Sequence, residues 1–133
     1  MTACGARALT CAAAHATINV IEDENLVKNC AVVGKHLGER FQQLKEKHQL
    51  VGDARGLGLM QALELVKDRK TKEPAPQATA AVFEETKKRG VLIGKGGVWG
   101  NVIRTGLMLN STKEHADQLA DAIDAGLMVA AKM

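Results

Sequence analysis

The amino-acid sequence predicts an α+β fold in which helices cover one face of a small, mostly antiparallel sheet of three or four strands. Residues 26–44 and 116–130 repeat apolar side chains at spacings of three and four, which is typical of amphipathic helices. Short apolar stretches at 59–66, 91–94 and 102–109 are typical of strands. The resulting order, helix, helix, strand, helix, strand, strand, helix, allows two or three helices to pack on one side of the sheet.

The first two helices are predicted to follow each other directly. Residues 8–22 are rich in alanine and show no clear polar face, so this helix is expected to project from the domain or to pair with another copy. Asp23 is predicted to cap the second helix. The apolar stripe of the second helix consists of Leu26, Cys30, Val33, Leu37, Phe41 and Leu44.

Glycines and capping residues divide the rest of the chain. Gly52, Gly56 and Gly58 exclude a helix before the strand at 59–66. A third helix is expected over 77–89, ended by Gly90. The last helix is expected to begin at a capping box of Ser111 or Thr112 with Glu114, and its buried stripe consists of Ala116, Leu119, Ala120, Ile123, Leu127 and Ala130.

The segment 90–112 is the most informative part of the chain, because it joins two apolar strands through a glycine-rich loop. Four glycines between Gly94 and Gly100 allow the backbone to approach a ligand or another chain closely. Arg104 lies within the second strand, where a buried arginine requires an anion, and its planar fork fits a carboxylate. The pattern leaves two interpretations open, a carboxylate-binding arginine or a surface arginine on the solvent face of a half-buried strand.

Composition excludes several classes of protein. A chain of 133 residues is about one domain long, and 46% apolar with 25% charged residues excludes disorder. The net charge of +3 and the scarcity of aromatic residues argue against nucleic acid as a partner. The apolar runs are too short to span a membrane. The three cysteines lack metal-ligand spacing and indicate a reducing, intracellular compartment.

Other motifs for phosphate, dinucleotide, metal or nucleophilic chemistry are incomplete. Residues 90–96 are similar to a phosphate loop, but Gly96 stands where Ser or Thr would hold magnesium. The glycine-rich start of 55–61 lacks the third glycine of a dinucleotide site, since Gln61 replaces it. The four histidines show no ligand spacing, so no metal site is predicted. Lys95 is expected to contact an anion or solvent rather than to act as a nucleophile.

Several segments in order resemble the C-terminal region of class III pyridoxal-phosphate-dependent aminotransferases, nearest to the alanine–glyoxylate aminotransferase 2 group. They are Leu-Thr-Cys-Ala-Ala-Ala at 9–14, Val-Ile-Glu-Asp-Glu-Asn-Leu at 20–26, Val-Gly-Asp-Ala-Arg-Gly-Leu-Gly-Leu-Met at 51–60, Gly-Val-Leu-Ile-Gly at 90–94, Ile-Arg-Thr-Gly-Leu-Met-Leu at 103–109 and Thr-Lys-Glu at 112–114. The resemblance implies the small C-terminal domain of the aspartate-aminotransferase fold type, packed on a larger cofactor-binding domain in a homo-oligomer.

The resemblance also implies an activity and a site residue. The activity is transfer of an amino group, by way of pyridoxal phosphate, between an amino acid such as alanine and a keto acid such as glyoxylate. Arg104 falls where the family provides the arginine that binds the substrate α-carboxylate, although Thr-Gly-Leu-Met follows it where the family has Ile-x-Pro-Pro. The family's threonine for the cofactor phosphate aligns with Ala3, which leaves Thr2, one position earlier, as the cofactor-binding candidate.

The Schiff-base lysine, the aspartate for the pyridine nitrogen and the stacking aromatic of the family have no match in this sequence. No catalytic residue is therefore predicted, and the chain alone is expected to be inactive. Residues 1–22 are expected to be a remnant of the large-domain junction and linking helix, and residues 23–133 the small domain. The alternative is a stand-alone, non-catalytic domain that binds amino or keto acids or another protein.

Two subcellular locations are open. The resemblance implies mitochondria. The tripeptide Ala131-Lys132-Met133 is a loose variant of the Ser-Lys-Leu peroxisomal address, which gives a peroxisomal alternative.

Overall fold

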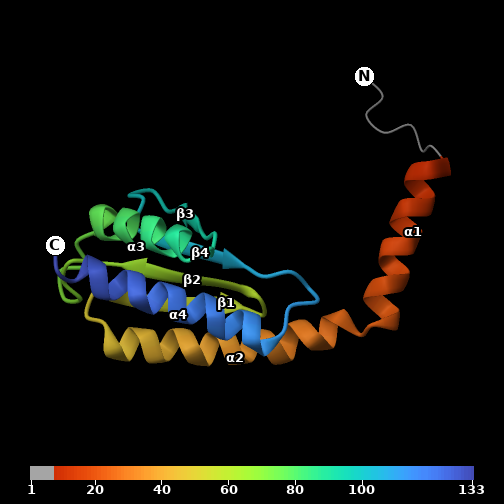
Figure 1. Ribbon diagram of the computed structural model, residues 1–133, viewed down its shortest axis with the longest axis horizontal. Helices are drawn as coiled ribbons and strands as arrows, with labels where there is room; N and C mark the ends of the chain where they lie inside the picture. The colour runs from red at the N-terminus through yellow and green to blue at the C-terminus, as the bar shows by residue number, and fades with distance from the viewer. Residues whose placement is uncertain (1–7) are drawn as a thin grey trace, which may run out of the picture.

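The computed structural model describes residues 8–133 and confirms the α+β class (Figure 1). The elements are α1 (Ala8–Asp23), α2 (Leu26–Lys47), β1 (Val51–Leu57), β2 (Met60–Leu65), α3 (Pro76–Lys88), β3 (Gly94–Gly96), β4 (Val102–Gly106) and α4 (Lys113–Ala130). All strand pairs are antiparallel, and the sheet has the order β1-β2-β4-β3. The predicted sheet of three or four strands therefore has four.

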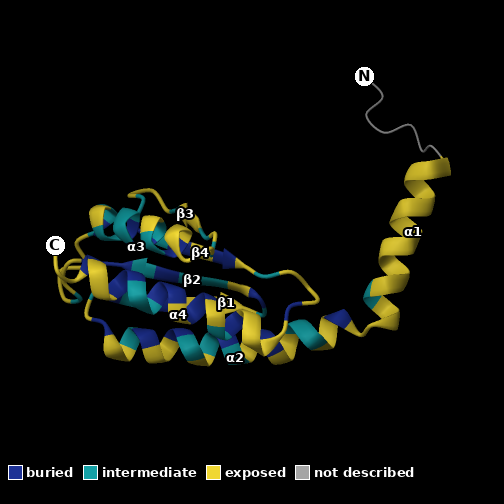
Figure 2. Cartoon of the chain, in the orientation of Figure 1, coloured by how far each residue is buried: buried dark blue, intermediate teal, exposed yellow. Residues whose placement is uncertain are grey.

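Helices α2, α3 and α4 cover the same face of the sheet, with α4 between the other two (Figure 1). The apolar stripes predicted for α2 and α4 face the core, and only Cys30 among them is incompletely buried (Figure 2). The core joins these stripes to the inward-facing strand residues Val51, Ala54, Leu63, Leu65 and Ile103. Apolar burial on this one face holds the domain together.

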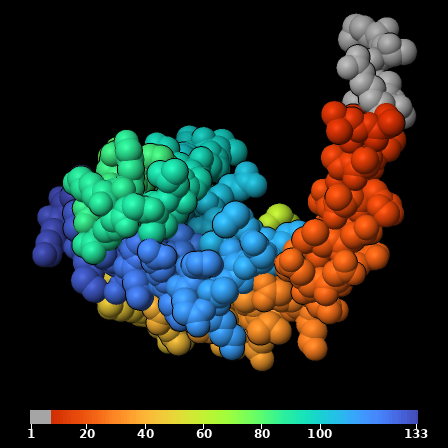
Figure 3. All heavy atoms as spheres, turned by 45° about the vertical axis from the view of Figure 1, so that its right-hand side comes forward, coloured from red at the N-terminus to blue at the C-terminus, as the bar shows by residue number. Residues whose placement is uncertain are grey.

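Helix α1 projects from the domain, as its sequence predicts. None of its residues is buried, and the space-filling view shows it standing away from the body of the molecule (Figures 2 and 3). Leu9 and Ile18 leave 82% and 53% of their surface exposed. Within the described chain, no helix combines the length and apolar character needed to cross a membrane.

Two predicted helix caps are wrong. Asp23 does not begin α2, because it is the last residue of α1; Asn25, in the left-handed conformation with φ 50°, precedes α2 instead. The capping box of α4 pairs Thr112 with His115 rather than with Glu114. The box needs a partner at the third helical position, and His115 occupies it because Thr112 rather than Ser111 is the cap. The end of α3 before Gly90, at φ 77°, is as predicted.

The strand predictions need three corrections. β1 was not expected, because its glycines and a bulge between Val51 and Asp53 hide the alternation of a strand. The strand predicted at 91–94 lies at 94–96, since Val91 and Ile93 pack against the core and residues 91–93 pair with no strand. The strand predicted at 102–109 ends at Gly106; beyond it, the amide of Asn29 donates to the backbone carbonyls of Leu109 and Ser111 (2.7 and 2.9 Å).

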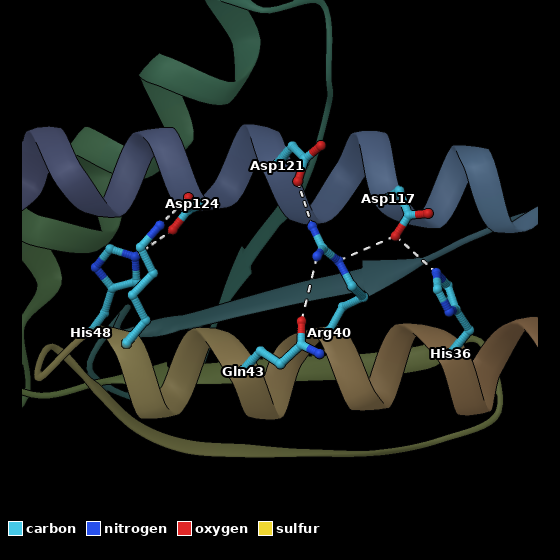
Figure 4. A network of polar contacts seen from close by, with 8 residues as sticks. His36, Arg40, Gln43, His48, Asp117, Asp121 and Asp124 are labelled. Atoms are coloured by element: carbon cyan, nitrogen blue, oxygen red, sulfur yellow. Dashed lines mark hydrogen bonds and ion pairs between the residues drawn. The ribbon is translucent and has the colours of Figure 1, made fainter.

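Acidic side chains of α4 meet basic side chains of α2 and the side chain of His48, the residue that follows α2, along a polar seam (Figure 4). Its contacts are Asp117 Oδ1 with His36 Nε2 (2.8 Å) and Arg40 Nε (3.2 Å), Asp121 Oδ1 with Arg40 Nη2 (2.5 Å), and Asp124 with Lys47 Nζ (2.6 Å) and His48 Nε2 (2.5 Å). Burial alone would raise the pKa of Asp124, but the hydrogen bonds from His48 and Lys47 outweigh it and lower that pKa. The seam thus fixes α4 beside α2.

Candidate functional site

The face of the sheet opposite the helices carries the candidate site. The turn Gly58-Leu59 joins β1 to β2 and pairs Leu57 with Met60. This register places Arg55, Ala62, Arg104 and Gly94 side by side across the four strands. Neighbouring strands lie about 4.8 Å apart, so the Cα atoms of the two arginines are separated by roughly 10 Å, with only the small Ala62 between them.

Arg55 is occupied by two carboxylates of the same face. Its Nη1 lies 2.8 Å from Asp53 Oδ2 and 2.7 Å from Glu64 Oε2. The hydrogen bond from Arg55 lowers the pKa of Asp53 against the opposing effect of burial, with a further contribution from Lys45. Asp53 and Glu64 in turn raise the pKa of Arg55. A ligand carboxylate would therefore compete with Asp53 and Glu64 for Arg55.

Arg104 differs from Arg55 in having no such partner. Its side chain is exposed, and it forms no hydrogen bond or ion pair with any residue of 8–133. Its stem lies over β3, since a Cβ added to Gly96 would be 3.2 Å from Arg104 Cδ. Arg104 also lines a groove of about 600 Å³ on this face, together with Arg55, Met60 and Ala62. An unpaired guanidinium in a groove can bind an anion, and a carboxylate fits its two parallel donors.

The structure shows whether Arg104 is buried or exposed, which the sequence pattern left open. Arg104 lies on the solvent-facing side of β4, where alternate residues Ile103 and Thr105 are buried. It is not a buried arginine awaiting an anion in the core. Its exposure is compatible with substrate binding, because the groove opens on the same side.

The described residues do not fit covalent attachment of a pyridoxal phosphate. Every described lysine is exposed except Lys45, which is half-buried and lies 3.3 Å from Asp53. A Schiff-base lysine needs a desolvated site or a neighbouring base that keeps its amine neutral. Lys95 is exposed on β3 and lies opposite Ile103 rather than beside Arg104. Residues 8–133 therefore offer no lysine suited to hold the cofactor.

The remaining predictions concern Thr2, metal ligands and the neighbours of Arg104. Thr2, the cofactor-binding candidate, lies outside the described residues. No three metal-ligating side chains gather anywhere in residues 8–133. Sequence reasoning missed Arg55, Asp53 and Glu64 as neighbours of Arg104. A two-residue turn at Gly58-Leu59 was the available signal, because it would have fixed the pairing of β1 with β2.

Comparisons with known proteins agree with this architecture. The family model described as aminotransferase class-III matches residues 2–127. The mitochondrial alanine–glyoxylate aminotransferase 2 homolog 2 of Arabidopsis thaliana is 49% identical over 120 residues, which cover 90% of this chain and 25% of that protein. A Bacillus anthracis aminotransferase superposes with a TM-score of 0.85 at 31% identity, covering 90% of this chain and 28% of that one.

A second solved structure adds the cofactor to the comparison. An amine transaminase of an uncultivated Pseudomonas species, in its PLP-bound form, superposes with a TM-score of 0.81 at 35% identity over 90% of this chain and 27% of that one. The chain belongs to the class III aminotransferases, a pyridoxal-phosphate-dependent family. It has the fold of their small domain and spans about a quarter of the length of the curated relatives it matches.

Proposed function

We propose that this chain acts as the small domain of a class III aminotransferase, in which Arg104 binds the α-carboxylate of the substrate. The observation that carries the proposal is the contrast between the two arginines of the open sheet face. Arg55 is held by Asp53 and Glu64, whereas Arg104 has no partner among residues 8–133 and faces a groove. A bidentate contact to a carboxylate would hold the amino group of the substrate in a fixed orientation.

The amino donor is proposed to be an amino acid such as alanine and the acceptor a keto acid such as glyoxylate. The support is the 49% identity to the Arabidopsis relative, whose name carries both substrates. The cofactor chemistry is assigned to a large domain of the kind that the rest of the relatives' length provides. Residues 23–133 then form the small domain and residues 1–22 its junction with the large one.

Helix α1 is proposed to pack against the large domain or against a second copy of the enzyme. Its apolar residues are otherwise open to water, which is unfavourable for a helix that stands alone. The second of these packings corresponds to the homo-oligomer that we propose for the complete enzyme.

Mitochondria are the proposed location, on the strength of the relative's name. The exposed Ala131-Lys132-Met133 keeps the peroxisomal alternative testable. A fluorescent protein ending in this tripeptide should remain diffuse, and peroxisomal spots would favour the alternative.

A chimera tests the proposed function. Residues 8–133 replace the matching C-terminal segment of the Arabidopsis relative, and transfer of the amino group from alanine to glyoxylate is measured. We expect activity that depends on both parts. A folded, cofactor-loaded chimera without activity would contradict the proposal. Binding of pyruvate or alanine to the 133-residue chain, combined with an inactive chimera, would favour a non-catalytic ligand-binding domain.

A further inference from the structure

Glu64 occupies a position from which it can reach either of two arginines. Arg55 and Arg104 are both in register with Ala62, on opposite sides of β2. Glu64 is two residues further along the same strand and on the same face, so it is the diagonal neighbour of both. Diagonal partners in an antiparallel sheet lie about 7–8 Å apart, within reach of long side chains.

In the structure Glu64 pairs with Arg55 and not with Arg104. Glu64 Oε2 is 2.7 Å from Arg55 Nη1, and Asp53 Oδ2 holds the same nitrogen at 2.8 Å. The stem of Arg104 turns to the other side, over Gly96 of β3. Gly96 has no positive φ, so its backbone would accept a side chain; the space above it is taken by Arg104 Cδ.

Loss of Arg55 would leave Asp53 with another cation nearby but would leave Glu64 without one. Asp53 would keep Lys45, whose Nζ lies 3.3 Å from Asp53 Oδ1. Glu64 would lose the only cation that it contacts within residues 8–133. The remaining arginine within diagonal reach is Arg104, and a carboxylate bound there competes with any carboxylate ligand for the same donors.

We propose that Arg55 is a positioning residue that keeps Glu64 away from Arg104 and so leaves Arg104 free to bind the substrate carboxylate. The inference deepens the proposed function and rests on it for the identity of the ligand. It assigns to Arg55 a role that does not require contact with the substrate. The charge of Arg55 is what matters, since any cation at that position would hold Glu64.

The test uses the 133-residue chain with ¹⁵N-labelled arginine and four variants, Arg55→Gln, Arg55→Lys, Glu64→Gln and the double variant Arg55→Gln/Glu64→Gln. In Arg55→Gln the Nε–H resonance of Arg104 should move as Glu64 pairs with it. It should keep its original position in the other three variants. An unchanged Arg104 resonance in Arg55→Gln would overturn the proposal, as would a shift that persists in the double variant.

Pyruvate is the probe for the carboxylate site, titrated at low ionic strength. Arg55→Gln should weaken its binding by about 2- to 5-fold, the range expected for competition from an exposed ion pair. Arg55→Lys and the double variant should restore binding to the level of the original chain. The proposed function fails if the folded, cofactor-loaded chimera is inactive, whereas the resonance comparison among the variants tests the role of Arg55 whether or not pyruvate binds the isolated chain.

Discussion

Gly34 of α2 and Gly58 of the β1–β2 turn meet backbone to backbone, so that a Cβ on Gly34 would lie 2.3 Å from the carbonyl carbon of Gly58. Gly38, one turn later on α2, has room: a Cβ there would lie 3.6 Å from the Gln61 amide nitrogen. The contact between Gly34 and Gly58 holds α2 against the β1–β2 hairpin, which carries Arg55 and Glu64.

Gly34→Ala should therefore destabilise the domain by about 3 kcal/mol, because the backbone of the turn must shift to accept the methyl group. Gly38→Ala is the matched control and should be neutral or stabilising by up to about 1 kcal/mol, the helix-propensity gain. Urea unfolding measures both. Equal effects of the two substitutions would contradict the close contact.

Arg69 joins the end of α2 to β1. Its guanidinium donates to the backbone carbonyls of Lys45, His48 (2.8 Å) and Val51 (3.1 Å). Arg69→Lys keeps the charge but cannot serve three carbonyls in this geometry, so it should cost about 1.5–3 kcal/mol of unfolding free energy. Arg89→Lys is the control, because Arg89 is exposed and its side chain has one partner, Glu85; it should change stability by less than about 0.5 kcal/mol. A similar small effect at Arg69 would show that its contacts contribute little.

The pKa of Asp124 gives the polar seam a predictable pH dependence. Because the folded pKa is lowered, the stabilisation is present above the unfolded value of about 3.9 and is lost as the pH falls through the folded pKa. Asp124→Asn should thus cost about 1.5–3 kcal/mol near pH 6, where the carboxylate binds Lys47 and the buried His48. The difference between the two proteins should shrink on acidification below about pH 4. A difference that is independent of pH would exclude the charged pairs as its cause.

Arg104→Lys should lower kcat/KM of the active chimera for a carboxylate-bearing amino donor by about thirty- to several-hundred-fold. Losing the bidentate contact is worth on the order of 2–4 kcal/mol in a closed site. Unfolding free energy and cofactor affinity should hardly change, since Arg104 is exposed and its guanidinium forms no hydrogen bond or ion pair within residues 8–133. Arg89→Lys again serves as the control. An unaltered kcat/KM would refute the assignment of Arg104.

The 133-residue chain should not hold pyridoxal phosphate covalently. Its described lysines are exposed or paired, so none is set up to attack the cofactor aldehyde. After incubation with the cofactor and dialysis, no cofactor absorbance should remain. Retained absorbance that disappears on replacement of one particular lysine would overturn this expectation. It would also contradict the proposal that the large domain supplies the cofactor chemistry.

The sequence by itself determined the α+β class, the stripes of α2 and α4 and the projecting α1. The stripes rest on periodicity within one segment, where spacings of three and four decide which side chains can be buried together. The projection of α1 rests on an alanine-rich segment without a clear polar face. It also singled out Arg104, through one charge in an apolar strand. These features need no knowledge of what lies across the sheet.

Only the tertiary structure decided the surroundings of Arg104. β1 escaped prediction because glycines and a bulge hide its alternation, and without β1 the pairing of Arg55 with Ala62 and Glu64 is invisible. Which of two arginines holds Glu64 depends on strand register and on the space above Gly96, both of which arise from contacts between segments distant in the chain. Register is set by burial of one whole face at once, so no single strand encodes it.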